Sequence, residues 1–330
     1  HGAAPKWRLG LGAEAFAEAL EGEGSRLIVR RGRAREVLRD LIRETGATEV
    51  HWNRLYDHVS RERDEGVKAA LKKDGIAAHS HAGHVLFEPW TVETKTGGYY
   101  KVYTPFWRAV RDRSPGDALD KPALSPPDRW PDSEDIADHA LGREMDRGAE
   151  VVRPHLAVGE RAARGRLGAF TGSGIDGYAK ARDDLARDGT SHLSENLTYG
   201  EISARACWWA ASRAKAEGKA GAESFLQELV WRDFAYHLVY HTPRIVDRNW
   251  REEWEAFPWN EDDGRDDVVA WTRGRTGMAI VDAAMRELYT TGRMHNRARM
   301  IVASYLTKHL LTHWRIGQRW FEDCLVDWDP

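Results

Sequence analysis

The sequence of 330 residues contains only two cysteines and no long hydrophobic run. Cys207 and Cys324 lie far apart and in no CxxC arrangement, so neither a disulfide framework nor a thiolate zinc site is predicted. No apolar run approaches the roughly 20 residues of a membrane helix, and no signal peptide opens the chain. The sequence therefore predicts a soluble, cytoplasmic protein with no membrane contact.

Neither sign of charge dominates, because the sequence has 49 lysines and arginines and 52 aspartates and glutamates, which gives a formal net charge of −3. Such a protein has no general attraction for polyanions, so any nucleic-acid binding requires a local basic patch. Tryptophan is the residue in excess, at 15 where an average chain of this length has about four or five. Most should pack in the core, but several could stack on bases or a flavin, or carry electrons.

Residues 26–80 alternate between short apolar runs and amphipathic segments. Runs at 27–29, at 50–52 and from Ile76 onward are typical of parallel strands joined by crossover helices. Only about three strands are visible where such a sheet usually has five or six, so we expect this domain to be incomplete at its start. The sequence thus predicts a partial, Rossmann-like parallel α/β domain over residues 1–87.

The rest of the chain has a different pattern. Residues 88–132 are rich in Pro, Gly and aromatics without sustained periodicity, and predict a connector over the surface. Residues 133–330 predict an all-helical domain, because nearly every segment has helical spacing. The main predicted helices cover 201–215, 223–241, 276–290 and 296–313. No closing element follows the last amphipathic segment, so we also expect a missing C-terminal piece.

Two patterns look like known sites but lack the required context. Gly172 to Gly177 match the glycine fingerprint of dinucleotide-binding folds, yet residues 164–170 before them are basic and helix-like instead of a strand. The i, i+4 histidine pairs are His237 with His241 and His309 with His313. Neither pair carries the glutamate of a zinc-protease motif or an evident third ligand, so no metal site is predicted.

The helical segment 223–234 places Glu228, Trp231 and Arg232 on one face. Such a face could hydrogen-bond a base edge, stack on the base and hold a phosphate. A surface Glu–Arg pair beside a partly buried tryptophan explains the same spacing, and the pattern alone favours this simpler interpretation.

Three further clusters are ambiguous when taken singly. Asn296, Arg299 and Met300 share a helix face, where an amide could read a base or a flavin edge and Arg299 could pair with a distant carboxylate. The hydroxyl-rich segment 189–194 could cradle a diphosphate, or could be a loop that caps a helix. Residues 325–329 offer two carboxylates around Trp328, whose role the spacing leaves open.

The order of these segments resembles the helical domain of the cryptochrome/photolyase family. The strings TSHLS, ELVWRDF, TGRMHNRARM and LVDWDP occur in register over about 140 residues, which excludes coincidence where one motif would not. The string AWTRGRTGMAIVDAAMREL lies between the second and third, and FEPWTV and YTPFWRAVR extend the similarity into the connector. The resemblance is to class I cyclobutane pyrimidine dimer photolyases, with the chain truncated at both ends.

The resemblance implies roles for individual residues. The first domain would carry an antenna chromophore, a folate or a deazaflavin, and the second would hold FAD beside a cavity for a dimer flipped out of DNA. The implied FAD-binding residues are Tyr178, Thr190, Ser191, His192, Leu193, Ser194, Phe225, Arg232, Asn296, Arg299, Asp327, Trp328 and Asp329. The implied catalytic, lesion-binding residues are Glu228, Trp231, Asn296 and Met300. The implied DNA contacts are Arg182, Glu228, Trp231, Arg232 and Arg297.

The implied activity is that of a deoxyribodipyrimidine photo-lyase. Excited, reduced FAD would give one electron to the dimer and recover it after the bonds break, while the protein positions and shields the reactants. Glu228 would hydrogen-bond the lesion, and Trp231 would stack on it. Trp314 and Trp259 resemble the middle and outer members of the family's electron-transfer chain. The inner tryptophan, a second stacking tryptophan and a flavin-facing asparagine would lie beyond Pro330.

Alternatives and departures accompany this interpretation. A cryptochrome photoreceptor shares the fold and FAD, but Trp231 and Met300 argue against it. A (6-4) photolyase uses histidines where Asn296 and Met300 stand, and a non-catalytic helical nucleic-acid-binding protein would bind no flavin. Arg293 stands where an aromatic is usual, Phe225 where a tryptophan is frequent, and residues 195–199 diverge. We expect a monomer that acts on dimer-containing DNA without an obligate protein partner.

Overall fold

The computed structural model describes residues 2–329. The chain divides into two compact units. Unit 1 comprises the residues up to Ala15, those from His139 to Glu201, and those from Asp247 onward. Unit 2 comprises Phe16–Asp138 and Ile202–Val246. Helix α1 (Ala3–Glu21) begins in unit 1 and ends in unit 2.

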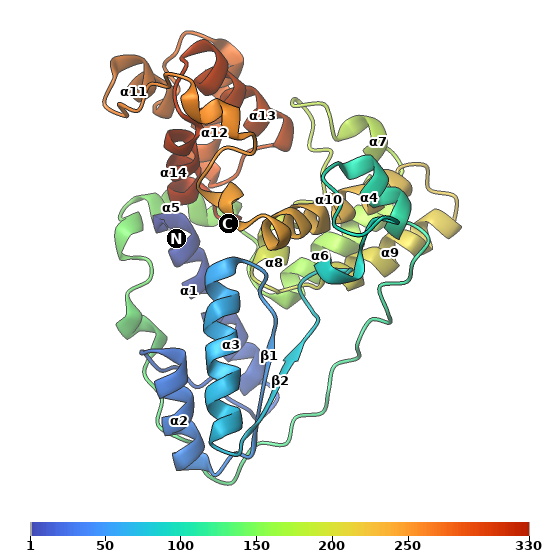
Figure 1. Cartoon of the computed structure of the whole chain (residues 1–330), viewed down its shortest axis with the longest axis vertical. Helices are drawn as coiled ribbons and strands as arrows, with labels where there is room; N and C mark the ends of the chain where they lie inside the picture. The colour runs from blue at the N-terminus through green and yellow to red at the C-terminus, as the bar shows by residue number, and fades with distance from the viewer. Residues whose placement is uncertain (1, 330) are drawn as a thin grey trace. The chain divides into compact units, whose positions relative to one another are not determined.

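Unit 2 contains a small parallel sheet made of β1 (Glu49–Asn53) and β2 (Ala77–His81). The crossover between them is α3 (His58–Lys73), which begins where the Asp57 side chain accepts the N–H of Ser60 at 2.8 Å. Val67 and Leu71 are the buried residues of α3. Figure 1 shows α3 alongside the two strands, with α2 (Ala34–Thr45) next to α3. The predicted strand–helix–strand unit is confirmed.

The predicted strand at 27–29 is wrong. Residues 25–30 have no regular secondary structure. The Val29 N–H donates to Ser133 Oγ at 2.9 Å, and the Val29 carbonyl accepts the N–H of Glu134 at 2.8 Å. The backbone of the apolar run is thus bonded to a loop. A short apolar run does not identify a strand by itself, because a strand also needs another strand beside it.

The remaining elements of unit 2 are helical. They are α4 (Tyr103–Val110), α9 (Ala204–Ala216), α10 (Ala222–His241) and the 3₁₀ turns η1 (Pro89–Thr91) and η6 (Pro243–Val246). Helix α9 begins after Ser203, whose hydroxyl accepts the N–H of Ala206 at 3.1 Å. Helix α10 buries Leu226, Leu229, Val230 and Phe234. Both helices match the predicted segments.

Unit 1 is built from helices and short turns. The α-helices are α5 (Gly148–Val152), α6 (Glu160–Ala169), α7 (Tyr178–Ala181), α8 (Ser194–Thr198), α11 (Asp266–Thr272), α12 (Ala279–Thr291), α13 (Asn296–Ser304) and α14 (Trp314–Cys324). The 3₁₀ turns are η2 (Ile136–His139), which spans the division, η3 (Arg143–Met145), η4 (Arg153–His155) and η7 (Glu252–Ala256). Two π-helical turns are η5 (Phe170–Gly174) and η8 (Tyr305–His309). Trp271, Met285 and Leu288 lie in one buried core cluster with Val302 and Leu306.

The predicted helix 296–313 ends early, because its last residues pair with another segment. After α13 and η8, Leu311 adopts a left-handed φ of 51°. The Asn260 N–H then bonds the Leu311 carbonyl, and the His313 N–H bonds the Asn260 carbonyl, each at 2.9 Å.

The fold bears on two predictions, that the glycine fingerprint is not a dinucleotide site and that the chain has no membrane helix. The glycine fingerprint at 172–177 follows helix α6, so it has no preceding strand to make it a dinucleotide site. Within residues 2–329, no helix combines the length and the apolarity needed to cross a bilayer.

Candidate functional site

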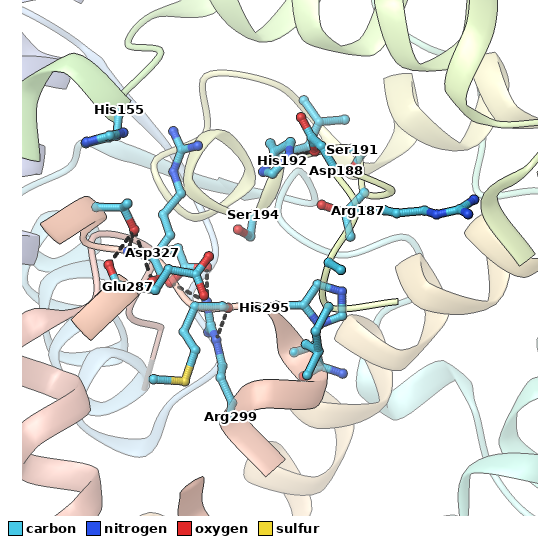
Figure 2. A pocket seen from close by; sticks show the side chains of 18 of the residues that line it. His155, Arg187, Asp188, Ser191, His192, Ser194, Glu287, His295, Arg299 and Asp327 are labelled. Atoms are coloured by element: carbon cyan, nitrogen blue, oxygen red, sulfur yellow. Dashed lines mark hydrogen bonds and ion pairs between the residues drawn. The ribbon is translucent and has the colours of Figure 1, made fainter. Parts of the chain in front are cut away.

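A cavity of about 610 Å³ lies within unit 1. Its walls come from the segment 185–194, the end of α12, the start of α13 and Asp327. The predicted cofactor residues that line it are Tyr178, Thr190, Ser191, His192, Leu193, Ser194, Asn296, Arg299 and Asp327. Figure 2 shows Ser191 and His192 on one side of the cavity and Asp327 and Glu287 on the other. The structure thus brings three of the sequence motifs to one place.

Arg299 and Asp327 form a fixed pair in the cavity wall. The Arg299 Nη2 lies 3.0 and 2.7 Å from the two carboxylate oxygens of Asp327, and its Nε donates to the Met294 carbonyl at 2.9 Å. Asp327 is only 6 % exposed. The distant carboxylate with which Arg299 could pair is therefore Asp327, and both ends of the guanidinium are oriented.

The segment before α8 has an unusual backbone. His192 adopts a left-handed φ of 52°, and its ring contacts Asp188. The His192 carbonyl accepts from Arg166 Nη1 at 2.9 Å. A non-glycine residue in this region costs about 1–3 kcal/mol, so the hydrogen bond from Arg166 and the contact with Asp188 help to hold this backbone conformation.

Two departures from the family pattern contact each other. Glu195, which is 1 % exposed, pairs through Oε1 with both Arg166 and Arg293, and through Oε2 with Arg8 Nε at 3.0 Å. The other two nitrogens of Arg8 donate to Glu201 at 2.9 and 2.6 Å. This Glu195 cluster places three guanidinium groups against two carboxylates. It leaves one positive charge in excess next to the cavity.

Two buried polar atoms of cavity-lining residues lack partners. Arg293 Nε and His295 Nε2 have no hydrogen-bond partner among the described residues. His295 Nδ1 accepts the N–H of Arg297 at 3.1 Å, so Nε2 carries the ring proton and is a donor. Burial lowers the pKa of Arg293. The cavity itself is lined by the hydroxyl, amide and guanidinium groups of Ser191, Ser194, Asn296 and Arg299, which suit an anionic ligand with many acceptor atoms, and FAD fits this description.

The predicted residues Phe225, Glu228, Trp231 and Arg232 lie on α10, in unit 2. Trp231 is 45 % exposed and stacks on Tyr103 of α4, with ring centroids 3.6 Å apart and planes 9° from parallel. Arg232 donates to the His84 carbonyl at 2.6 Å and to the His84 ring at 2.9 Å. Phe225 is buried. Helix α10 thus presents one exposed aromatic beside a fixed cation.

Besides the residues of α10, three further predicted lesion-binding or FAD-binding residues do not line the cavity. Met300 of α13 is exposed, while Trp328 packs against the core cluster of unit 1. Among the residues that the structure describes, Met300, Trp328 and Asp329 do not line the 610 Å³ cavity.

A buried carboxylate on α10, Asp233, is absent from the predicted site residues. Asp233 accepts the N–H groups of Leu86 and Phe87 at 2.9 and 2.8 Å, and burial raises its pKa to about 7. The signal was present, because Asp233 follows Leu229 and Val230 by four and three residues and so occupies a core position.

A titration should reveal how His84 is held beside Arg232. Burial and, second, the Arg232 guanidinium lower the pKa of His84 to about 3 from an ordinary 6.5. Between these values the unfolded chain binds one more proton than the folded chain, so the stability from this group is lost as pH falls from 6.5. His84→Gln should reduce the slope of unfolding free energy against pH, measured from about pH 5 to 6, by up to about 1.4 kcal/mol per unit. The exposed His58→Gln is the control, and an unchanged slope in His84→Gln contradicts the assignment.

The two predicted electron-transfer tryptophans are linked through one ring. Trp259 meets His313 edge-on with centroids 6.1 Å apart, and His313 stacks on Trp314 at 5.6 Å. The Trp314 Nε1 donates to Asn249 Oδ1 at 2.9 Å, which fixes the indole. The sequence did not indicate His313 as the intervening ring.

The two arginines predicted to contact DNA phosphates meet at one carboxylate. Arg297 Nε lies 2.8 Å from Asp183 Oδ1, and Arg182 Nε lies 3.6 Å from the same atom. The Arg297 hydrogen bond is the main cause that lowers the pKa of Asp183.

Two family models and a curated relative match the chain. A model of the FAD binding domain of DNA photolyase matches residues 225–330, and a DNA photolyase model matches residues 1–127. A deoxyribodipyrimidine photo-lyase of Agrobacterium fabrum is 43% identical over 332 residues, covering 100% of this chain and 69% of the relative. The chain belongs to the cryptochrome/photolyase family. The predicted fold class, an α/β domain followed by a helical FAD-binding domain, is confirmed.

A solved photolyase structure and a cryptochrome are also similar to the chain. The crystal structure of a bacterial class III photolyase from Agrobacterium tumefaciens matches with a TM-score of 0.94 and 43% identity, covering 100% of this chain and 68% of that one. Cryptochrome-2 of Arabidopsis thaliana is 32% identical over 348 residues, covering 99% of this chain and 56% of the relative. A photo-lyase and a cryptochrome are thus both similar to the chain, at 43% and 32% identity respectively.

Proposed function

We propose that the chain is a deoxyribodipyrimidine photo-lyase, which binds FAD in the 610 Å³ cavity and splits cyclobutane pyrimidine dimers in DNA in response to light. The observation that carries the proposal is the convergence of three family motifs on one cavity lined by hydroxyl, amide and guanidinium groups. FAD bound there supplies the light-excited electron that opens the dimer. A cryptochrome is the second candidate, and Trp231 and Met300 favour repair over it.

The cavity residues have distinct tasks in this proposal. Arg299 and Asp327 orient the cofactor through a pair that cannot rotate away. The excess positive charge of the Glu195 cluster, through Arg293, favours the anionic groups of FAD. Ser191, Ser194 and Asn296 supply hydroxyl and amide groups. On α10, Glu228 and the exposed Trp231 are proposed to receive the lesion, and Arg232 to lie near the phosphates.

FAD titration of purified, flavin-stripped chain tests the cofactor site. Arg299→Met leaves the Asp327 carboxylate buried without its partner and facing an anionic ligand. Loss of this charged hydrogen bond should weaken FAD binding by about 1.5–3 kcal/mol, or roughly 10- to 150-fold. The control is Arg319→Met, which removes an exposed arginine paired with Asp263. Equal FAD affinity in the two variants contradicts the proposed site.

Photoreduction of bound FAD should depend on Trp314. Trp314→Phe keeps an aromatic ring but is harder to oxidise, so blue-light reduction of oxidised FAD should slow greatly. Repair by chemically reduced enzyme should persist, because the relay is not used in the repair step. Absorbance during illumination measures the first quantity and dimer loss measures the second. If both rates equal those of the wild type, Trp314 is not a relay.

DNA binding should respond to the carboxylate shared by the two arginines. Arg297→Ala should flatten the slope of log affinity against log salt by about one unit, because one phosphate contact is lost. Asp183→Asn should tighten binding, because it removes the anion that competes with phosphate for Arg182 and Arg297. Fluorescence anisotropy on a labelled duplex measures both effects. Unaltered binding in both variants would remove this patch from the DNA interface.

Several finer assignments stay predictions. Class I membership is one, since the similar structure from Agrobacterium tumefaciens is titled a class III photolyase. The domain boundaries at 87 and 132, the monomeric state, the absence of a protein partner and the cytoplasmic location are others. For the second chromophore, folate or deazaflavin, we propose a pocket of about 220 Å³ in unit 2. Its aromatic lining consists of Trp52, Tyr56, Trp90 and Tyr240.

A further inference from the structure

One face of the β1–β2 sheet carries three histidines and a glutamate. Glu49 and His51 alternate along β1, and His79 and His81 alternate along β2. The parallel register sets His51 directly opposite His79, so the side-chain period of two places all four on the same face. Ser80 points the other way, toward α3, where Lys68 Nζ lies 3.5 Å from its hydroxyl. The four groups therefore share the face opposite α3, and all four are exposed.

The donor atoms of three of these residues converge. Glu49 Oε2 lies 3.3 Å from His51 Nε2 and 3.9 Å from His79 Nε2. All three donors lie within 4.8 Å of one another. Metal bonds of about 2.0–2.2 Å in a tetrahedral arrangement place ligand atoms about 3.3 Å apart. Small side-chain rotations thus suffice to bring these three groups around one ion.

His81 sets the orientation of His51. The His51 Nδ1 lies 2.9 Å from His81 Nε2, and the two rings are stacked with planes 7° apart. When Nδ1 carries the proton and donates it to His81, the lone pair of His51 lies on Nε2, on the side of Glu49. A metal-binding histidine ordinarily has its other nitrogen held in this way.

From this geometry we propose that Glu49, His51 and His79 bind a divalent transition-metal ion such as zinc, with His81 as the residue that positions His51. Two imidazoles and a carboxylate suit zinc, while magnesium and calcium prefer all-oxygen ligand sets. The exposure of the site leaves a fourth position for water, and a bound ion would tie β1 to β2. The sequence predicted no metal site, since the two strands are far apart in the chain and only their register unites the ligands.

The rival explanation needs no metal. A protonated His51 could bridge Glu49 and His81 with its two N–H groups. The two explanations differ in whether the chain binds a stoichiometric metal ion that depends on both His51 and His79. This inference does not depend on the proposed repair activity.

Calorimetric titration of the whole chain with zinc chloride at about pH 7.5 decides between them. We expect one zinc ion per chain, no binding of magnesium, and at least about tenfold weaker binding in His51→Ala and in His79→Ala, the smallest loss typical even for residues that only orient a ligand. His58→Ala, which removes an exposed histidine paired with Glu62 on α3, is the matched control and should bind as the wild type does. Circular dichroism of each variant checks that the fold is intact.

Three results would overturn the proposal. The first is the absence of stoichiometric zinc binding by the wild type. The second is undiminished binding by the folded double variant His51→Ala/His79→Ala, which places zinc elsewhere. The third is equal weakening by His58→Ala, which reduces the effect to nonspecific surface histidines.

Discussion

Replacing Glu195 by glutamine should destabilise the fold by about 3–5 kcal/mol, the range found when one partner of a buried ion pair is removed. Glu195 is 1 % exposed and holds Arg8, Arg166 and Arg293. The variant would leave those three cations with only Glu201 to balance them. Urea unfolding of the wild type and the variant, followed by far-ultraviolet circular dichroism, measures the loss.

A matched variant and a rescue make this prediction specific. Glu160→Gln removes an exposed carboxylate paired with Arg164 on α6 and should change stability by no more than about 0.5 kcal/mol. Adding Arg293→Met to Glu195→Gln removes one unbalanced cation and should recover part of the loss, so the two substitutions should not be additive. Additive losses, or equal losses in Glu195→Gln and Glu160→Gln, would contradict the proposed charge balance.

Trp231→Ala should weaken binding to dimer-containing DNA by about 1–3 kcal/mol, which is roughly 5- to 150-fold. Trp231 is 45 % exposed and backed by Tyr103, so it offers one face of a rigid aromatic pair to a flipped base. Binding to undamaged duplex depends mainly on phosphates and should change little. Anisotropy titrations with damaged and undamaged oligonucleotides give the selective loss.

Two control variants separate recognition from stability. Trp231→Phe keeps a stacking ring and should retain most of the selectivity. Trp250→Ala removes another exposed tryptophan and should leave lesion selectivity unchanged. If Trp231→Ala lowers affinity for both DNAs equally and also lowers the melting temperature strongly, then Trp231 serves to pack against Tyr103 and does not read the lesion.

The fold was predictable where a local pattern decides it. The helical spacing of segments 201–215 and 223–241 predicted α9 and α10 nearly at their observed bounds. The run at 27–29 failed because its partners, Ser133 and Glu134, lie about a hundred residues away and are invisible to a local pattern. The early end of α13 likewise depends on pairing with the distant Asn260.

The candidate site also has parts that local motifs predicted and parts that only distant contacts create. The motif strings predicted most of the cavity walls, whereas the spacing left the partner of Arg299 open and only the structure identifies it as Asp327. The Glu195 cluster was not predictable, because Arg8, Arg166 and Arg293 belong to three separate segments. Arg293 and Glu195 looked like two unrelated departures from the family pattern. In the structure they are one ion pair, so each departure accounts for the other.

The most direct test of the account is light-dependent repair by the FAD-loaded chain. Chemically reduced protein would be mixed with an oligonucleotide that contains one cyclobutane thymine dimer, and chromatography would follow the dimer under blue light and in the dark. The account predicts that the dimer is restored to two thymines under light only. A chain that binds both FAD and the damaged oligonucleotide, yet leaves the dimer intact under light, would contradict the repair function and favour a cryptochrome-type role.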